Sequence, residues 1–161
     1  MAGNIWVLAE QWRGQISDVT YEALALGREV ADQLGVQLQA VLLGHRAKHL
    51  AAELGKADLV LCAEHPELAE PVAGPLAAAL AQLAREQRPR AVLIPLTNIS
   101  LDVAPLVAAE LQLPLVNFCV DLRATDGRLE ADCVLYGGKI DVKVAIPQEG
   151  AIIGLWPGAR P

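Results

Sequence analysis

Aromatic side chains are scarce in this chain of 161 residues, at 4% of the sequence, although apolar residues as a whole make up 53%. The core is therefore expected to consist of Leu, Val, Ile and Ala. Long apolar runs are also missing, because no stretch approaches the ~20 apolar residues of a membrane-spanning helix. Basic residues are few, and the net charge is −6. These features argue against nucleic-acid binding and membrane insertion, and they favour one packed domain over residues 1–161.

Most motifs that bind phosphate or perform catalysis are absent as well. No G-x-G-x-x-G follows the first apolar run, and neither G-x-x-x-x-G-K-[ST] nor G-x-S-x-G occurs. The S-G-G-x-D-S loop of ATP pyrophosphatases is also missing. No pair of side chains forms an acid–base or nucleophile arrangement. The sequence thus gives no positive evidence for catalysis and favours a domain without catalytic residues of its own.

Cysteine and histidine are too few to indicate a disulfide framework or a metal centre. Cys62, Cys119 and Cys133 lie in apolar, strand-like runs without C-x-x-C spacing. We expect buried free thiols in a reducing compartment. His45 and His49 are four residues apart and could face one metal, but no third ligand lies near them in the sequence. Surface histidines are the favoured interpretation, and no metal site is predicted.

The chain begins with an apolar run that has no basic segment before it, over Met1–Ala9. We therefore expect neither a signal peptide nor a transit peptide, and a cytoplasmic location.

The first two thirds of the sequence alternate between short apolar runs and segments with helical spacing. Apolar residues recur every three or four positions from Val19 to Leu34, and Pro105 fits the first turn of a helix that begins near Asp102. Such a strand–helix alternation predicts an α/β fold with a parallel sheet covered on both faces. The predicted strands are Asn4–Ala9, Val36–Leu43, Leu59–Ala63 and Ala91–Leu96.

The last third changes to strands joined by turns. Asp126-Gly127 and Gly137-Gly138 are strong hairpin signals between alternating runs. We expect a meander of antiparallel strands that extends the parallel core at its C-terminal end. Its predicted strands are Leu115–Ala124, Leu129–Tyr136, Lys139–Ile146 and Ala151–Trp156.

Polar residues cluster where the strand Ala91–Leu96 passes into the next helix. In an open parallel sheet, such a turn is the usual place for a ligand, and N–H groups at the helix start can hold an anion. The alternative is that Asn98, Ser100 and Asp102 only cap the helix and shape the turn. The candidate cofactor-binding residues are those of this turn and of the end of the first strand, namely Glu10, Gln11, Thr97, Asn98, Ser100 and Asp102.

A second candidate is the turn Tyr136, Gly137, Gly138 and Lys139. It is a candidate partner-facing loop, and its alternative is an ordinary type I′ hairpin turn.

Several segments in the same order resemble the amino-terminal domain of electron transfer flavoprotein alpha subunits. The resemblance begins at Ile5-Trp-Val-Leu-Ala-Glu10 and includes Ala57-Asp-Leu-Val-Leu61. It continues through Pro89-Arg-Ala-Val-Leu-Ile94 and Asp102-Val-Ala-Pro105, where the family has R-D-L-A-P-R. It ends with Cys119-Val-Asp-Leu122, Asp126-Gly127-Arg128-Leu129 and Tyr136-Gly-Gly-Lys139.

The resemblance implies a three-layer α/β/α fold of the adenine-nucleotide-hydrolase-like type. In that family, this domain packs against the beta subunit, and FAD is held mainly by the alpha subunit's second domain, whose glycine-rich segments are not found here. The beta subunit holds AMP in a related fold, but its acidic, glycine-containing loop is not matched. Leu101 and Leu106 stand where the family usually has arginine.

Two hypotheses of different classes follow. The first is a scaffold and docking domain of a flavin-dependent electron-transfer complex, with FAD held largely by other chains. Its expected partner is a beta-like subunit or a separate FAD-binding chain. The second is a small regulatory module that binds a nucleotide of the AMP or ATP type. Self-association into a homo-oligomer and the absence of any bound cofactor are compatible with either.

Overall fold

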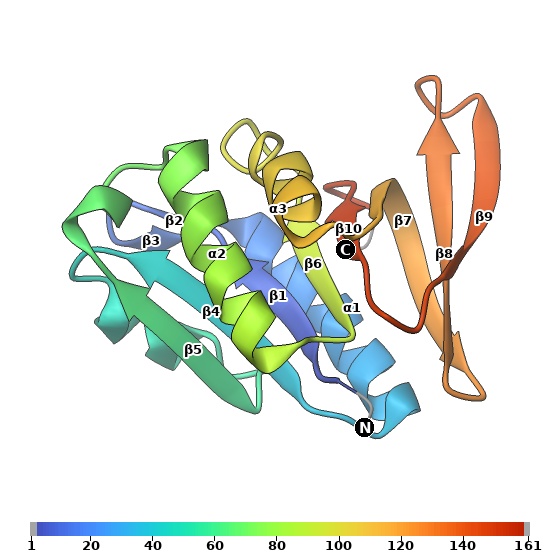
Figure 1. Cartoon of the computed structure of the whole chain (residues 1–161), viewed down its shortest axis with the longest axis horizontal. Helices are drawn as coiled ribbons and strands as arrows, with labels where there is room; N and C mark the ends of the chain where they lie inside the picture. Colours follow the sequence, from blue (N-terminus) through green and yellow to red (C-terminus); the bar gives the residue numbers. More distant parts are fainter. Residues whose placement is uncertain (1–2, 160–161) are drawn as a thin grey trace.

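A mostly parallel sheet forms the centre of the computed structural model, which describes residues 3–159 (Figure 1). Six strands run parallel in the order β5-β4-β1-β6-β10-β7, and β8 and β9 continue the sheet antiparallel beyond β7. The predicted α/β class with an antiparallel C-terminal extension is therefore confirmed. The strands are β1 (Ile5–Ala9), β4 (Leu38–Gly44), β5 (Leu59–Glu64), β6 (Ala91–Pro95), β7 (Leu115–Thr125), β8 (Arg128–Leu135), β9 (Ile140–Ile146) and β10 (Ile152–Leu155).

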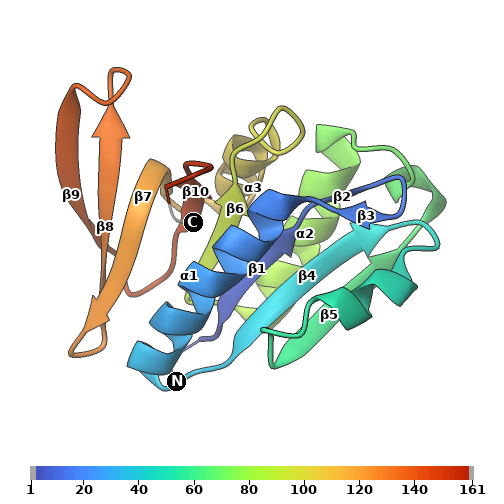
Figure 2. The same ribbon diagram turned by 180° about the vertical axis from the view of Figure 1, so that it is seen from behind.

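Helices cover both faces of the sheet, as Figures 1 and 2 show from opposite sides. The helix α1 (Asp18–Leu34) lies on one face, and α2 (Ala73–Gln87) and α3 (Val103–Leu111) lie on the other. The remaining elements are short, namely the 3-10 helices η1 (Lys48–Glu53) and η2 (Pro66–Leu68) and the hairpin of β2 (Gln11–Trp12) with β3 (Gln15–Ile16).

The core divides into two layers because side chains alternate along each strand. In β1, Ile5 and Val7 belong to the cluster under α1, whereas Trp6 and Leu8 belong to the cluster under α2 and α3. All five residues of β1 are buried. Continuous burial explains why this strand is apolar throughout instead of alternating with polar residues.

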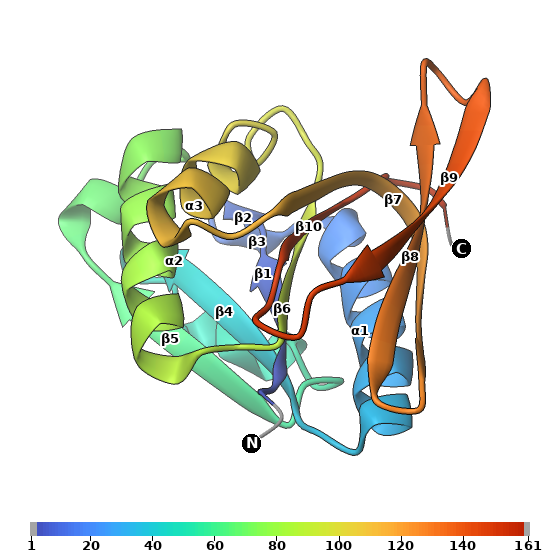
Figure 3. The ribbon, with the colours of Figure 1, turned by 45° about the vertical axis from the view of Figure 1, so that its right-hand side comes forward.

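The last strand, β10, lies elsewhere than the sequence pattern indicated. It does not pair with β9 but enters the sheet between β6 and β7, parallel to both (Figure 3). The expected continuation of the antiparallel meander into Ala151–Trp156 is thus wrong. All four residues of β10 are buried. Such a short, fully apolar strand gains more from helices on both faces than from an exposed edge position.

The turn between β7 and β8 agrees with its prediction from the sequence. Asp126 and Gly127 both have positive φ, at 54° and 75°, and form the two-residue turn predicted between β7 and β8. The segment after β1 contains the short β2–β3 hairpin. Within residues 3–159, no helix is long and apolar enough to cross a membrane.

Candidate functional site

The carboxyl ends of β1 and β6 meet at the centre of the sheet, where the chain turns to opposite faces. The helix that follows β1 is α1, on one face, and the helix that follows β6 is α3, on the other. This is the topological switch point at which open α/β sheets usually bind their ligands. The candidate residue Glu10 directly follows β1, Thr97 lies two positions after the end of β6, and the fold brings them together as the sequence predicts.

The Glu10 carboxylate is held on both oxygens by hydroxyl groups. Thr97 donates its Oγ1 hydrogen to Oε2, and Ser17 donates its Oγ hydrogen to Oε1 over 2.9 Å. The side chain is nearly enclosed, since Glu10 is 8% exposed. Ser17 is the residue before α1, but its side chain makes no capping hydrogen bond to the helix and donates to Glu10 instead. Through these hydrogen bonds, the Glu10 side chain links the segment after β6 to the residue before α1.

The turn from Thr97 to Ser100 also uses its polar groups internally. Thr97 Oγ1 accepts hydrogen bonds from the backbone N–H groups of Ile99 and Ser100, both at 3.2 Å. The Ser100 hydroxyl accepts from the Thr97 N–H at 3.2 Å and donates to the carbonyl oxygen of Pro95. These hydrogen bonds shape the turn. An anion could bind the polar groups of the turn only if it displaced several of these hydrogen bonds.

The other candidate residues of this region lie outside that network. Asn98 and Asp102 are exposed, and Asp102 precedes α3 without a side-chain capping bond. Gln11 is half-buried, and its Nε2 donates to the carbonyl oxygen of Leu43 at 3.3 Å. The structure therefore unites Glu10, Thr97 and Ser100, places Gln11 beside them, and leaves Asn98 and Asp102 facing solvent.

A hollow lies beside this network on the α2 and α3 face. Its space, counted out to open solvent, is ≈ 430 Å³. Most of its lining is apolar, and Glu10, Gln11 and Ser100 are its polar members. A small, largely apolar group with a few hydrogen-bonding atoms suits such a lining. Its apolar lining comes from Leu8, Ala9, Leu43, Leu68, Ala69, Pro71, Leu76, Ile99 and Val103.

The second candidate region is an antiparallel arm formed by residues 121–146, which comprises the end of β7 with β8 and β9. The arm projects past the rest of the fold, and its β8–β9 loop lies at the same end of the molecule as the loop before α3 (Figure 3). β7 bends before the arm, where Phe118 has a φ of 56° and the pairing register shifts between Cys119 and Asp121. Such a bulge redirects a strand.

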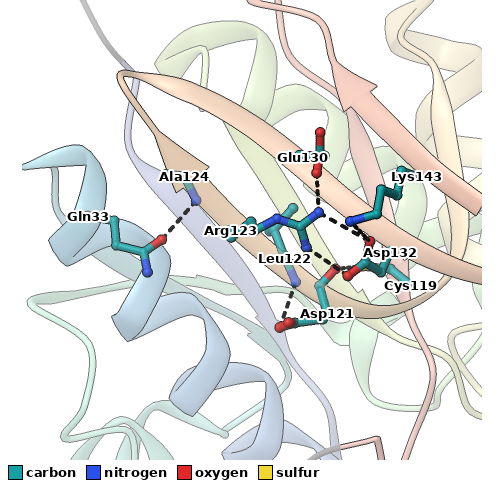
Figure 4. Close-up of polar contacts among 9 residues, drawn as sticks. All are labelled: Gln33, Cys119, Asp121, Leu122, Arg123, Ala124, Glu130, Asp132 and Lys143. Atoms are coloured by element: carbon teal, nitrogen blue, oxygen red, sulfur yellow. Dashed lines mark hydrogen bonds and ion pairs between the residues drawn. The ribbon is translucent and has the colours of Figure 1, made fainter.

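One face of the arm is charged. Arg123 on β7 forms ion pairs with Glu130 and with Asp132 on β8, the second at 2.7 Å, and Lys143 on β9 lies 3.9 Å from Asp132 (Figure 4). The hydrogen bond from Arg123 holds the pKa of Asp132 below its usual value. This face is a solvated, internally paired surface.

The opposite face of the arm is apolar, and only its base is covered. Leu122, Leu129 and Ala131 are buried in the core under α1, and the Ala124 N–H donates to Gln33 Oε1 of α1 at 2.8 Å (Figure 4). Toward the tip, Leu135 and Val142 are only partly buried, while Ile140 is 46% exposed and Tyr136 77% exposed. The same face that packs on α1 thus continues as an uncovered apolar surface.

The candidate loop at the tip is longer than a two-residue turn. Leu135 pairs with Ile140, so the loop comprises Tyr136, Gly137, Gly138 and Lys139. The φ angles of its first three residues are 51°, 66° and 86°. Positive φ at Tyr136 is unusual for a residue with a side chain, and it places the aromatic ring of Tyr136 on an exposed turn.

The prediction of buried free cysteines is met in part. Cys119 and Cys133 are buried free thiols that face each other across β7 and β8, but Cys62 on the edge strand β5 is exposed, contrary to expectation. Edge strands lack a covering neighbour on one side, and a sequence run alone does not reveal that. His45 and His49 are exposed, and residues 3–159 contain no cluster of three metal-ligating side chains.

The molecule is a three-layer α/β domain with a projecting antiparallel arm. Side chains of the chain itself close its switch point. Residues 5–161 match the family model described as "Electron transfer flavoprotein domain". The chain therefore belongs to the electron transfer flavoprotein family, and flavin is the cofactor associated with that family.

Curated relatives of the chain are named as electron transfer subunits or as FixB. It is 37% identical to the acryloyl-CoA reductase electron transfer subunit beta of Anaerotignum propionicum over 74% of its length, and 36% identical to protein FixB of Clostridium saccharobutylicum over 90%. It is 35% identical over 85% to the electron transfer flavoprotein subunit alpha of Clostridium acetobutylicum. The chain covers only 33%, 44% and 42% of these relatives. It thus spans between a third and a half of their length.

Proposed function

We propose that this chain is a scaffold and docking domain of a flavin-dependent electron-transfer complex, with FAD held largely by a partner chain. Family membership supports the electron-transfer role. The observation that carries the docking role is the uncovered apolar face of the arm, which ends in Ile140 and Tyr136. The proposed partner is a beta-like subunit of the same family or a separate FAD-binding chain.

The arm has the physical features of a docking surface. Its charged face is already paired internally through Arg123, whereas its apolar tip has no covering element among residues 3–159. Exposed aromatic and aliphatic side chains on a projecting, hydrogen-bonded hairpin provide anchors at small entropic cost, because the backbone is already ordered. The predicted loop residues Tyr136, Gly137, Gly138 and Lys139 form the end of this surface.

A matched pair of substitutions tests the docking role. Ile140 on β9 and Leu59 on β5 are both 46% exposed and lie on opposite edge strands of the same sheet. The tagged chain should be isolated natively from its source cells and its partners identified by mass spectrometry. We expect a flavoprotein partner that is retained by Leu59→Asp and lost with Ile140→Asp. Isolation of the wild-type chain alone, or as a homo-oligomer only, would contradict the proposal.

The hollow beside Glu10 supports a second candidate function, the binding of a nucleotide such as AMP. Its support is the position at the switch point and the polar members Glu10, Gln11 and Ser100 in an apolar lining. A saturable thermal shift with millimolar AMP, ADP, ATP or FAD that disappears in Ala69→Phe, which fills the hollow, is the expected result for this function. The docking hypothesis predicts no such shift. The cytoplasmic location expected from the sequence stays a prediction.

A further inference from the structure

A second hollow lies at the opposite end of the sheet from Glu10 and Thr97. It is open to solvent, and its space, counted out to open solvent, is ≈ 990 Å³. Its lining comes from the segment before β6, the connection from β9 to β10 and the β7–β8 turn. Its side chains with polar or charged groups are Arg88, Arg90, Gln148 and Glu149. No prediction from the sequence pointed to this place.

Arg90 is enclosed to an extent that is rare for an arginine, since it is 5% exposed. Its Nη1 donates to the carbonyl oxygen of Pro147 at 2.5 Å. Its Nη2 is buried and has no hydrogen-bond partner among residues 3–159. A guanidinium stays charged in proteins, and leaving one of its donors buried without an acceptor is costly. Arg90 therefore has a buried N–H donor for which the described structure supplies no acceptor.

The charges around this donor favour an anion. Arg88 lines the same hollow from the end of α2, where it is exposed. Among the described lining residues, Glu149 carries the one negative charge. Burial lowers the pKa of Arg90, and the charge of Glu149 offsets part of this effect. Glu149 does not accept a hydrogen bond from Nη2. The described lining of the hollow therefore carries two positive charges and one negative charge.

We propose that this hollow binds a small oxyanion, a phosphate or carboxylate group, which accepts a hydrogen bond from Arg90 Nη2. Arg88 adds the second positive charge. Arginine suits this task because its planar group donates in a fixed direction to phosphate and carboxylate oxygens. Nη2 is buried in the described structure, so neighbouring side chains must shift before an oxyanion oxygen reaches it, and only a small group fits. This site is independent of the arm and of the hollow beside Glu10.

Titration of the purified chain with inorganic phosphate, and separately with acetate, tests the proposal. Sodium chloride at equal ionic strength controls for general screening. We expect phosphate or acetate to raise the melting temperature saturably and to shift the NMR signal of the Arg90 side-chain Nε–H group. The anion that gives the larger effect identifies the preferred chemistry.

Substitutions locate the effect. Arg88→Gln should weaken anion binding about tenfold, the change expected for one charged contact. Arg90→Lys keeps the charge but loses the planar group, and it should abolish the NMR-monitored response. Arg46→Gln, which removes an exposed arginine after β4, should leave binding unchanged. If Arg90→Lys does not fold, the change in anion binding of Arg88→Gln tests the proposal.

Two results would overturn the proposal. One is the absence of any saturable effect beyond that of chloride, as expected if Nη2 is held by a buried water only. The other is equal anion binding in wild type and Arg88→Gln.

Discussion

The hydroxyl of Thr97 donates a hydrogen bond to the carboxylate of Glu10, 87 positions earlier in the sequence. This contact joins the carboxyl ends of β1 and β6 at the point where parallel sheets usually leave room for a ligand. In this chain the same residues stabilise one another, so the switch point is closed by its own side chains. The more open surface of the molecule is the apolar tip of the arm.

Removing the Thr97 hydroxyl should destabilise the fold. Thr97→Val keeps the shape of the side chain but deprives Glu10 Oε2 of its donor, and it also deprives the N–H groups of Ile99 and Ser100 of their acceptor. We expect the free energy of unfolding to fall by about 1–3 kcal/mol. Urea denaturation measures it. Thr125→Val, at the exposed last residue of β7, is the control and should change stability by less than about 0.5 kcal/mol. Equal losses in the two variants would contradict this role.

Gly154 should not tolerate a side chain. A Cβ atom there would lie 2.1 Å from Asn117 Oδ1 and 2.9 Å from Leu96 Cδ2, so β10 could no longer lie close to β7. We expect Gly154→Ala to lower the free energy of unfolding by about 1–3 kcal/mol, as overpacking does. Gly74→Ala in α2 has open space around it and should be neutral or stabilising. A double variant with Asn117→Ala should recover part of the loss. A neutral Gly154→Ala would refute the close packing.

The Arg123–Asp132 pair should make stability depend on pH in the acid range. The folded state holds the pKa of Asp132 below its unfolded value. The contribution of the pair is therefore present above the unfolded pKa of about 3.9 and is lost as pH falls through the folded pKa. We expect Asp132→Asn to be less stable than wild type at pH 7 and equally stable in strong acid, with a smaller difference at high salt. A difference that does not vary with pH would contradict the pairing.

The three thiols should differ in reactivity. Burial raises the pKa of Cys119 to about 12, and Cys133 faces it in the same layer. Cys62 is exposed on β5, although partial burial and Glu64 raise its pKa as well. A thiol reagent at pH 8 should label Cys62 first and the other two only after denaturation, because the thiolate is the reactive form. Rapid labelling of all three in the native protein would show that the arm opens from α1.

Local patterns in the sequence predicted the local structure well. The spacing of apolar residues from Val19 to Leu34 corresponds to α1, and Asp126-Gly127 forms the turn that this pair predicts. The joining of Glu10 and Thr97 also follows from the sequence, because the carboxyl ends of neighbouring parallel strands meet at one edge.

The position of β10 could not be derived from turn signals, because a turn reports the neighbours of a strand along the chain and not across the sheet. The continuous apolar run Ile152–Leu155 was the available signal, since it is typical of a strand covered on both faces. The ion pairs of Arg123 and the buried, unpaired Nη2 donor of Arg90 depend on how distant segments pack, which no spacing in one sequence specifies.

The most direct test of the account is the identity of the small molecule released when the protein is denatured. The chain should be purified alone and also together with its native partner, and any released compound should be identified by chromatography and mass. The account predicts that the partner-containing complex releases FAD and that the chain alone releases no flavin or nucleotide. Stoichiometric FAD from the chain alone would contradict the scaffold role, and stoichiometric AMP would favour the nucleotide-binding alternative.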